Sequence, residues 1–490
     1  MDDGKKLGVI SLAALVVGAM IGGGIFSLPQ NMAQNASVTA VMISWVITGI
    51  GMFFIAGTFR ILSAARPDAT TGIYAYARLG FGRFAGFQMA WSYWLCNIFG
   101  NVGYAVLLMD ALDYFFPGVF TGGNNVNSII GGSIVIWLMN FAVLKGVRQA
   151  AFINVIGTIC KLLPIALFII IMIAVFRWRM FSADMCGQEA DAAAGIKPLG
   201  SMISQIRSTM LVTLWAFIGI EGAVVVSGKA RSQRDVGKAT VLGFLGCLII
   251  YALLSILPFG YMHQAGLAKL ANPSTAPLLQ AAVHGAWGGD IMNIGVIIAL
   301  LTSWLAFTIM ISQIPYAAAQ DGTFPAIFTR ENSHQAPSVS LWITSLVMQI
   351  AMIMVLFFNN AWNTMLSITT VMILPPYLAC TLFLWKICKD GTFPEGTGSG
   401  RLFALLCGIA GSIYAGWMIY AAGLEYLLCA FIFMVIGIPV FVLARRNAIA
   451  SGQSYEDERI FTPRELLFAV LIVAAAVIAA IAMIAGKLNL

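Results

Sequence analysis

Charged side chains are scarce in this sequence. Asp, Glu, Lys and Arg together make up 10% of the 490 residues, against about 25% in soluble globular domains. Hydrophobic residues make up 60%, and the mean hydropathy is +0.90. Because a soluble domain needs a largely polar and charged surface, this composition excludes an ordinary soluble protein.

The groups that carry most enzyme and metal chemistry are also few or dispersed. The three histidines fall in loops, and the eight cysteines show no spacing typical of metal ligands. The apolar segments hold no serine–histidine or paired-aspartate arrangement. We therefore expect no enzymatic activity, no metal and no cofactor. The net charge of +7 is spread over separate loops, so no nucleic-acid partner is expected either.

Long apolar runs are what the sequence has instead. They recur from end to end, and each is about 20 residues long, which is enough to span roughly 30 Å of hydrocarbon. The sequence predicts an all-α polytopic membrane protein with 12–13 transmembrane helices. These helices are expected near residues 8–33, 38–62, 84–116, 127–144, 150–176, 203–227, 238–262, 289–317, 339–358, 361–385, 402–421, 424–444 and 465–486.

The positive charges orient these predicted helices. With the N-terminus in the cytoplasm, the inner segments hold 20 of the 27 Lys and Arg residues and the outer segments hold six. The remaining one, Lys161, lies inside a predicted helix. Such an asymmetry follows the positive-inside rule. The sequence therefore predicts a multi-pass protein with a cytoplasmic N-terminus.

Two predicted helices contain glycines that interrupt them. Gly22–Gly24 are consecutive within the first apolar segment, where each costs about 1 kcal/mol relative to alanine in a helix. Five helices later, residues 215–223 combine two glycines with a carboxylate. Interrupted helices at equivalent places in two halves are typical of transporters built from inverted repeats, whose broken helices bind a substrate carboxylate. We expect a five-plus-five inverted-repeat fold, with repeats in 1–200 and 201–385 and additional helices in 386–490.

Two charged residues lie within predicted spans. Such a group is costly in lipid unless it is paired, protonated or hydrated, so it indicates a functional site. Glu221 is interpreted as a contact for a cationic part of the ligand or as a control on helix 6, with a structural hydrogen bond as the alternative. Lys161 is expected to face helix 1, where its charge takes the place of a bound Na⁺; a structural pairing is the alternative.

Polar and aromatic residues recur on one face of the third predicted helix. Tyr93, Asn97, Asn101 and Tyr104 are spaced i, i+4, i+8 and i+11, which places them on one side. This stripe fits a polar route with aromatic walls, and equally asparagines that join membrane helices. On helix 6, Trp215 can cap a bound cation, although packing is the usual role of a tryptophan in an apolar helix.

Several motifs give the chain a family resemblance. It resembles the amino acid–polyamine–organocation superfamily over essentially its whole length, and within it the bacterial antiporters that exchange arginine for agmatine or ornithine. This likeness implies a bacterial cytoplasmic (inner) membrane, small amino-acid and amine substrates, a surrounding lipid bilayer and a homodimer. The motifs that carry it are 22–32 (GGGIFSLPQNM), 72–76 (GIYAY), 214–222 (LWAFIGIEG), 316–319 (YAAA) and 321–325 (DGTFP).

The resemblance also implies roles for individual residues. The backbone amides of the first break are expected to bind the substrate carboxylate, and carbonyl groups near Ile218 to receive the α-amino group. Trp215 is expected to close over the ligand, and Glu221 to couple helix 6 to its neighbours. The substrate-binding set is Ile21, Gly22, Gly23, Gly24, Asn101, Trp215, Ile218, Phe307 and Thr369, and the gating or coupling set is Tyr93, Lys161, Trp215, Glu221 and Tyr377.

Two positions depart from the arginine/agmatine pattern. Those exchangers have a tryptophan on helix 8 that stacks on the guanidinium group, and Phe307 stands there, with Trp304 one turn earlier. Phenylalanine offers a weaker cation–π surface than tryptophan. Ala19 stands where the family has a polar residue near the first break. The resemblance therefore implies a basic amino acid more strongly than arginine in particular.

Together these features predict a secondary-active antiporter. Helices 1, 2, 6 and 7 are expected to rock against helices 3, 4, 8 and 9, exchanging external arginine for an intracellular product of its metabolism, agmatine or ornithine. The alternatives are a proton-coupled symporter or a uniporter for a basic or other amino acid, and a non-transporting sensor on the same scaffold.

Overall fold

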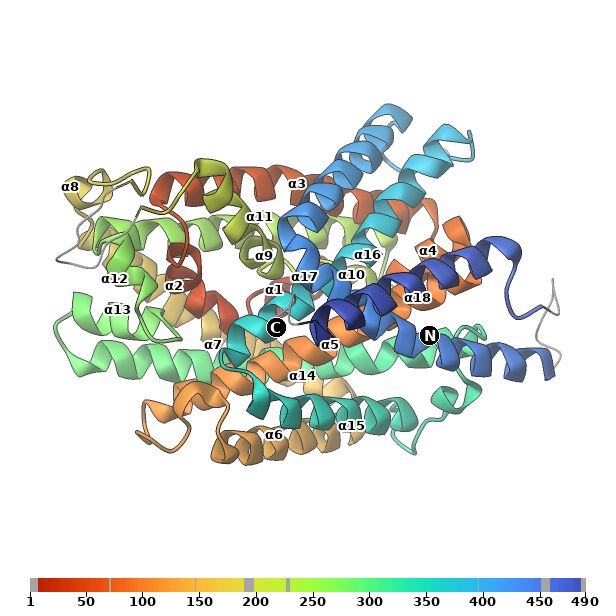
Figure 1. Cartoon of the computed structure of the whole chain (residues 1–490), viewed down its shortest axis with the longest axis horizontal. Helices are drawn as coiled ribbons and strands as arrows, with labels where there is room; N and C mark the ends of the chain where they lie inside the picture. Colours follow the sequence, from red (N-terminus) through yellow and green to blue (C-terminus); the bar gives the residue numbers. More distant parts are fainter. Residues whose placement is uncertain are drawn as a thin grey trace.

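The fold is a bundle of long helices. The computed structural model describes residues 8–69, 72–145, 147–188, 198–225, 230–394, 396–450 and 459–485, and within these ranges every regular element is a helix (Figure 1). The chain is therefore an all-α polytopic membrane protein, as its apolar runs predict. The long helices are α3 (Val38–Ala65), α5 (Arg83–Asp113), α6 (Val126–Leu144), α7 (Val147–Ala174), α11 (Gln233–Ile256), α14 (Ala286–Gln320), α15 (Ser338–Met354), α16 (Ala361–Lys389), α17 (Arg401–Ala450) and α18 (Pro463–Ile484).

The described part of the structure has fewer candidate spans than the 12–13 predicted helices, because broken and bent helices are counted differently. In the described ranges, 10 helices are long and apolar enough to cross a bilayer, or 11 if a bent N-terminal pair is one span. α17 alone has 50 residues, with a non-helical residue at Gly423 (φ 81°, ψ 159°). At 1.5 Å per residue it is about 75 Å long, more than twice what one crossing needs. α17, drawn as two arms at an angle in Figure 1, therefore accounts for the helices predicted at 402–421 and 424–444.

The first predicted break is present. α1 (Val9–Met20) ends at Ile21, whose φ of −78° and ψ of 71° are not helical, and the chain continues as η2 (Gly23–Ser27) and α2 (Leu28–Ala33). The two halves are bent by 43°. Residues 18–33 are all buried. Protein therefore surrounds the interrupted backbone, which is the condition for a broken helix at membrane depth.

The second break divides helix 6. α9 (Met202–Trp215) is followed by turns over residues 216–221 and then by α10 (Gly222–Val225), so neither piece is long enough to count as a span. Gly219 has a φ of +109°. A Cβ atom on Gly219 would lie 2.9 Å from Cβ of Ala19 and 3.1 Å from the backbone nitrogen of Met20. The two breaks therefore touch each other in the interior.

Burial separates central helices from peripheral ones. In the most apolar window of each helix, 83% of α5, 78% of α16 and 72% of α14 is buried, against 33% of α6 and 22% of α18. An apolar helix that is exposed on most of its surface suits contact with lipid tails. α5, α14 and α16 thus form the centre of the protein, and the two breaks lie against this centre.

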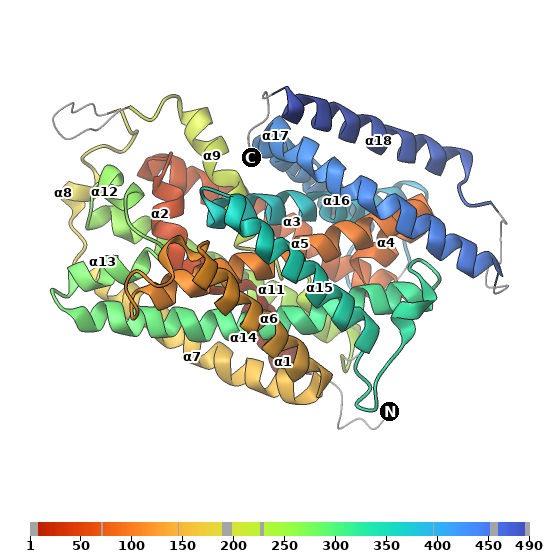
Figure 2. The ribbon, with the colours of Figure 1, turned by 60° about the horizontal axis from the view of Figure 1, so that its bottom comes forward.

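Short helices cover the two ends of the bundle. Figure 2 shows α8 (Trp178–Phe181), α12 (Gln264–Ala268) and α13 (Thr275–Ala282) at one end, with α4 (Ile73–Phe81) toward the other. The motif at 72–76 lies between two predicted helices, where a loop is expected, and residues 73–76 are instead the start of α4. The positive φ of Gly72 (+64°) lets the chain turn sharply into this helix. The division into repeats at residues 200 and 385 stays a prediction.

Candidate functional site

A cavity with an empty volume of about 320 Å³ lies beside the two breaks. Its walls come from α1, α5, α9, α14, α16 and the turns that follow α9. Five residues of the predicted substrate-binding set line it. The full lining is Met20, Asn97, Gly100, Asn101, Tyr104, Trp215, Ile218, Phe307 and Thr369.

Two polar side chains in the cavity have unused hydrogen-bonding atoms. Asn101 and Thr369 are 1% and 2% exposed, and neither Oδ1 of Asn101 nor Oγ1 of Thr369 has a partner among the described residues. Buried polar atoms are nearly always paired in folded proteins. In contrast, Nδ2 of Asn97 is already engaged, because it donates to the backbone carbonyl of Tyr93 at 2.7 Å. Asn101 and Thr369 are therefore the groups free to bond a polar ligand or a water molecule.

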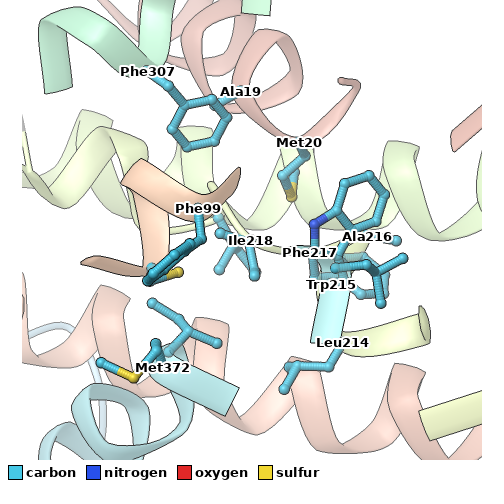
Figure 3. Packing of buried hydrophobic residues seen from close by; sticks show 14 of the residues in the cluster. Ala19, Met20, Phe99, Leu214, Trp215, Ala216, Phe217, Ile218, Phe307 and Met372 are labelled. Carbon is cyan, nitrogen blue, oxygen red and sulfur yellow. The ribbon is translucent and has the colours of Figure 1, made fainter. Parts of the chain in front are cut away.

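Aromatic rings form much of the cavity wall. The rings of Phe307 and Tyr104 are 6.0 Å apart, and the indole of Trp215 meets that of Trp362 edge-on at 5.4 Å. Figure 3 shows Phe307 of α14, Met20 of α1, and Trp215 and Ile218 of broken helix 6 around one region. Aromatic faces attract a cation through the ring quadrupole. The cavity therefore combines polar hydrogen-bonding atoms with surfaces suited to a cationic group.

The glycines of the first break lie behind this aromatic wall. A Cβ atom on Gly24 would lie 1.6 Å from Cη2 of Trp215, and one on Gly22 would lie 2.2 Å from the hydroxyl oxygen of Tyr104. Only glycine lets both rings approach the backbone this closely. Ile21 is buried, and its carbonyl accepts a hydrogen bond from Ser303 at 3.2 Å. Ile21–Gly24 thus support the cavity, while Met20 is the part of the first break that lines it.

Glu221 joins helix 6 to two other helices. Its Oε1 accepts from the hydroxyl of Tyr93 on α5 at 2.9 Å, and its Oε2 accepts from the hydroxyl of Tyr377 on α16 at 2.7 Å. Oε2 also accepts from the backbone N–H of Gly219 at 3.1 Å. All three side chains are at most 1% exposed. Three residues of the predicted gating set therefore form one buried network. In the sequence, Trp215 precedes the turns of the second break and Glu221 ends them.

Lys161 forms a second buried connection. Its Nζ atom donates to the carbonyl of Gly18 on α1 at 2.6 Å and to Oγ of Ser303 on α14 at 2.9 Å. Lys161 is 0% exposed, and its bond to Gly18 shows that it faces helix 1, as predicted. Ser303 was not predicted, because a serine in an apolar helix gives no sequence signal of its partner. The ammonium group thus links α7 to both α1 and α14.

The end of the bundle that holds α4 brings two of the motifs together. Nη1 of Arg78 lies 2.6 Å from Oδ2 of Asp321, and the hydroxyl of Tyr74 donates to the same oxygen at 3.3 Å. In the loop before α4, the hydrogen bonds from the Arg66 guanidinium lower the pKa of Asp68. Both ion pairs are partly exposed, and such pairs contribute only about 0–1 kcal/mol each to stability. They are therefore suited to opening and closing at small cost.

The structure also shows residues that sequence reasoning missed. Met20 and Gly100 line the cavity, and Trp362 packs on Trp215, although none of them was predicted as a site residue. Trp304 is completely buried and does not line the cavity. It therefore does not substitute for the tryptophan that the arginine/agmatine exchangers have at the position of Phe307. Of these residues, only Met20 could have been predicted from its position in the sequence, because it lies just before the first break.

Comparisons with known proteins give relatives along the whole chain. A family model described as amino acid permease matches residues 7–450. A protein of Clostridium perfringens named as an amino-acid transporter is 56% identical over 98% of each chain. Proteins named arginine/agmatine antiporter are 57% identical in Chlamydia felis, over 90% of each chain, and 52% identical in Chlamydia trachomatis, over 99% of this chain and 98% of that one.

Proposed function

The chain belongs to the amino acid permease family, and on that premise we propose that it is an antiporter that exchanges external arginine for internal agmatine. The observation that carries this proposal is the cavity at the meeting point of the two helix breaks, where unpaired polar atoms face aromatic rings. The names of the relatives from Chlamydia support the substrate pair. Ornithine, the other expected counter-substrate, has no such support.

The cavity suits the three charged groups of arginine. The guanidinium group is placed between the rings of Phe307, Tyr104 and Trp215, where cation–π attraction is available. The free oxygens of Asn101 and Thr369 accept hydrogen bonds from its N–H groups. We place the carboxylate at the first break, where Met20 lines the cavity, and the α-amino group at carbonyls of the second break. Agmatine keeps the guanidinium contacts and lacks only the carboxylate.

Alternating access follows from contacts on either side of the cavity. We assign the N-terminus to the cytoplasm of a bacterium, so that α8, α12 and α13 face outward. Trp215 and Trp362 then close the outer side, and the Glu221 network and the Arg78–Asp321 pair close the inner side. Bound substrate is expected to lower the barrier between the two closures, and the empty carrier reorients slowly. This difference makes transport an exchange.

Preloaded proteoliposomes test the proposal directly. We expect rapid uptake of labelled arginine into vesicles loaded with agmatine, and little uptake into empty vesicles or vesicles loaded with ornithine or lysine. Because agmatine carries one more positive charge than arginine, an inside-positive potential is expected to accelerate this exchange. Equal uptake into empty vesicles would contradict antiport. If uptake is instead driven by ornithine and is insensitive to potential, then ornithine and not agmatine is the counter-substrate.

Loss of the Lys161 ammonium group is expected to slow exchange. Lys161→Met removes two charge-assisted hydrogen bonds, each contributing about 1.5–3 kcal/mol, so we expect a reduction of about tenfold or more in the initial rate. Ser303→Ala is the comparison variant, since it removes one of the two bonds and keeps the bond from Lys161 to Gly18; its rate should fall between those of Lys161→Met and the wild type. Wild-type exchange by Lys161→Met would contradict a coupling role.

A further inference from the structure

A second, larger hollow lies outside the substrate cavity. It has an empty volume of about 1,000 Å³ and is bounded by α2, α9, α16 and α17. We call it the outer vestibule. Most of its named polar residues carry amides or hydroxyls, and one carries a charge. They are Asn31, Gln34, Asn35, Arg207, Ser208 and Asn363.

The outer vestibule and the substrate cavity are lined by neighbouring residues of two helices. Leu211 on α9 lines the vestibule, and Trp215, one turn farther along, lines the cavity. On α16, Leu366 lines the vestibule and Thr369, three residues later, lines the cavity. A helical turn rises about 5.4 Å. A substrate in the vestibule is therefore about one helical turn from the cavity, with Trp215 next on its path.

Arg207 is the one charged residue in the lining of the vestibule that the structure describes. Its guanidinium carbon lies 5.2 Å from the ring centre of Tyr420, and its Nη2 is 3.3 Å from where a Cβ of Gly423 would be. The bend of α17 thus leaves room for this side chain. A guanidinium group matches the planar geometry of a carboxylate and binds it through two parallel hydrogen bonds.

A second observation points to a ligand at the same place. Asn31 is only 6% exposed, yet neither its Oδ1 nor its Nδ2 has a hydrogen-bond partner among the described residues. This amide lines the vestibule together with Arg207. An acceptor oxygen and a donor N–H in the same hollow as a guanidinium group suit the ammonium and carboxylate groups of an amino acid.

We propose that the outer vestibule is a first binding site for the α-carboxylate of an incoming amino acid, with Arg207 as its specificity-determining residue. This inference rests on the proposed exchange function. An amine without a carboxylate gains nothing from Arg207 and is repelled by its charge. The vestibule therefore selects arginine over agmatine at the outer face, although both occupy the inner cavity. External arginine thereby competes better than external agmatine for the outward-open carrier.

Transport measured separately at the two faces tests this site. Intact cells that express the full chain present only the outer face, and inverted vesicles from the same cells present only the inner face. At the outer face, Arg207→Gln is expected to raise KM for arginine about fivefold, the upper end for one exposed ion pair, without lowering the maximal rate. KM for external agmatine should stay the same or fall. KM for arginine at the inner face should not change.

Matched variants separate this role from a general effect of charge or folding. Arg179→Gln removes an exposed arginine of α8 that is not part of the vestibule, and it should leave both KM values unchanged. Arg207→Lys should raise the outer KM for arginine only about twofold, because the charge remains and the paired geometry is lost. An unchanged inner KM in Arg207→Gln shows that the variant is folded.

The possible failures are distinguishable. No exchange by the wild-type chain at either face would overturn the proposed function. Normal exchange with the same outer KM in Arg207→Gln and wild type would overturn the vestibule site alone. An equal rise of KM for arginine and agmatine, or the same rise in Arg179→Gln, would also overturn it, because neither depends on the carboxylate.

Discussion

Replacing Glu221 with alanine is expected to abolish most exchange while leaving folded protein in the membrane. The carboxylate accepts hydrogen bonds from Tyr93, Tyr377 and the backbone of Gly219, and so ties the second break to α5 and α16. A hydrogen bond to a charged group contributes about 1.5–3 kcal/mol. Since each 1.4 kcal/mol is about tenfold, loss of three such bonds should reduce the exchange rate at least about 1,000-fold.

Partial removal of the same network should give graded losses. Tyr93→Phe and Tyr377→Phe each delete one hydroxyl, and each should lower the rate about tenfold, the value for one hydrogen bond to a carboxylate. Glu221→Gln keeps the shape of the side chain but replaces one acceptor oxygen with an NH₂ group. The NH₂ group therefore meets at least one of the three donors that the carboxylate accepted from. The exchange rate of Glu221→Gln should lie between those of the tyrosine variants and that of Glu221→Ala.

The measurement is the initial rate of labelled arginine uptake into agmatine-loaded proteoliposomes, normalised to the amount of inserted protein. Size-exclusion profiles in detergent serve as the control for folding. If Glu221→Ala keeps more than half of the wild-type rate, the network is structural and does not couple helix 6 to transport. Additive losses in the Tyr93→Phe/Tyr377→Phe double variant would indicate two independent contacts instead of one network.

The helix breaks were predictable because their cause is local. Three consecutive glycines disfavour a helix whatever surrounds them, and the structure ends α1 at Met20, two residues before Gly22. The bounds of α3 and α5 also follow from where the apolar runs stop. The helix α4 was missed because it has nine residues and follows a glycine, a pattern that also fits a loop. Its place is decided by packing against α5 and α16.

The site was less predictable because its contacts join residues far apart in the sequence. Lys161 was recognised from its charge, but its two acceptors lie more than 140 positions away. The ring of Trp362 meets Trp215 only because α16 crosses α9. Asn101 was indicated by the spacing of polar residues on one helix face and Thr369 by the family resemblance, and their unpaired atoms became visible only in the structure. Side-chain packing between helices carries no periodic signal in a single sequence.

The contact between the two breaks leads to the last prediction. Gly219→Ala is expected to reduce exchange at least about 100-fold, because two costs combine. The φ of +109° is strained for any residue with a side chain, at about 1–3 kcal/mol. The new methyl group would also lie 2.9 Å from Cβ and 3.0 Å from the carbonyl carbon of Ala19. Since backbone cannot rotate away as a side chain can, relief requires α1 to move away from helix 6.

A matched glycine makes this prediction specific. Gly246 lies in α11, and a Cβ atom there would meet no atom within 4 Å, so Gly246→Ala should stay within about twofold of the wild-type rate. Arginine binding to detergent-solubilised protein, measured beside exchange, separates a lost site from a blocked movement. Because Gly219 lies directly between Glu221 and the first break, loss of both binding and exchange is expected. Normal binding with no exchange would instead mean that the breaks form the site independently and that their contact serves only the movement.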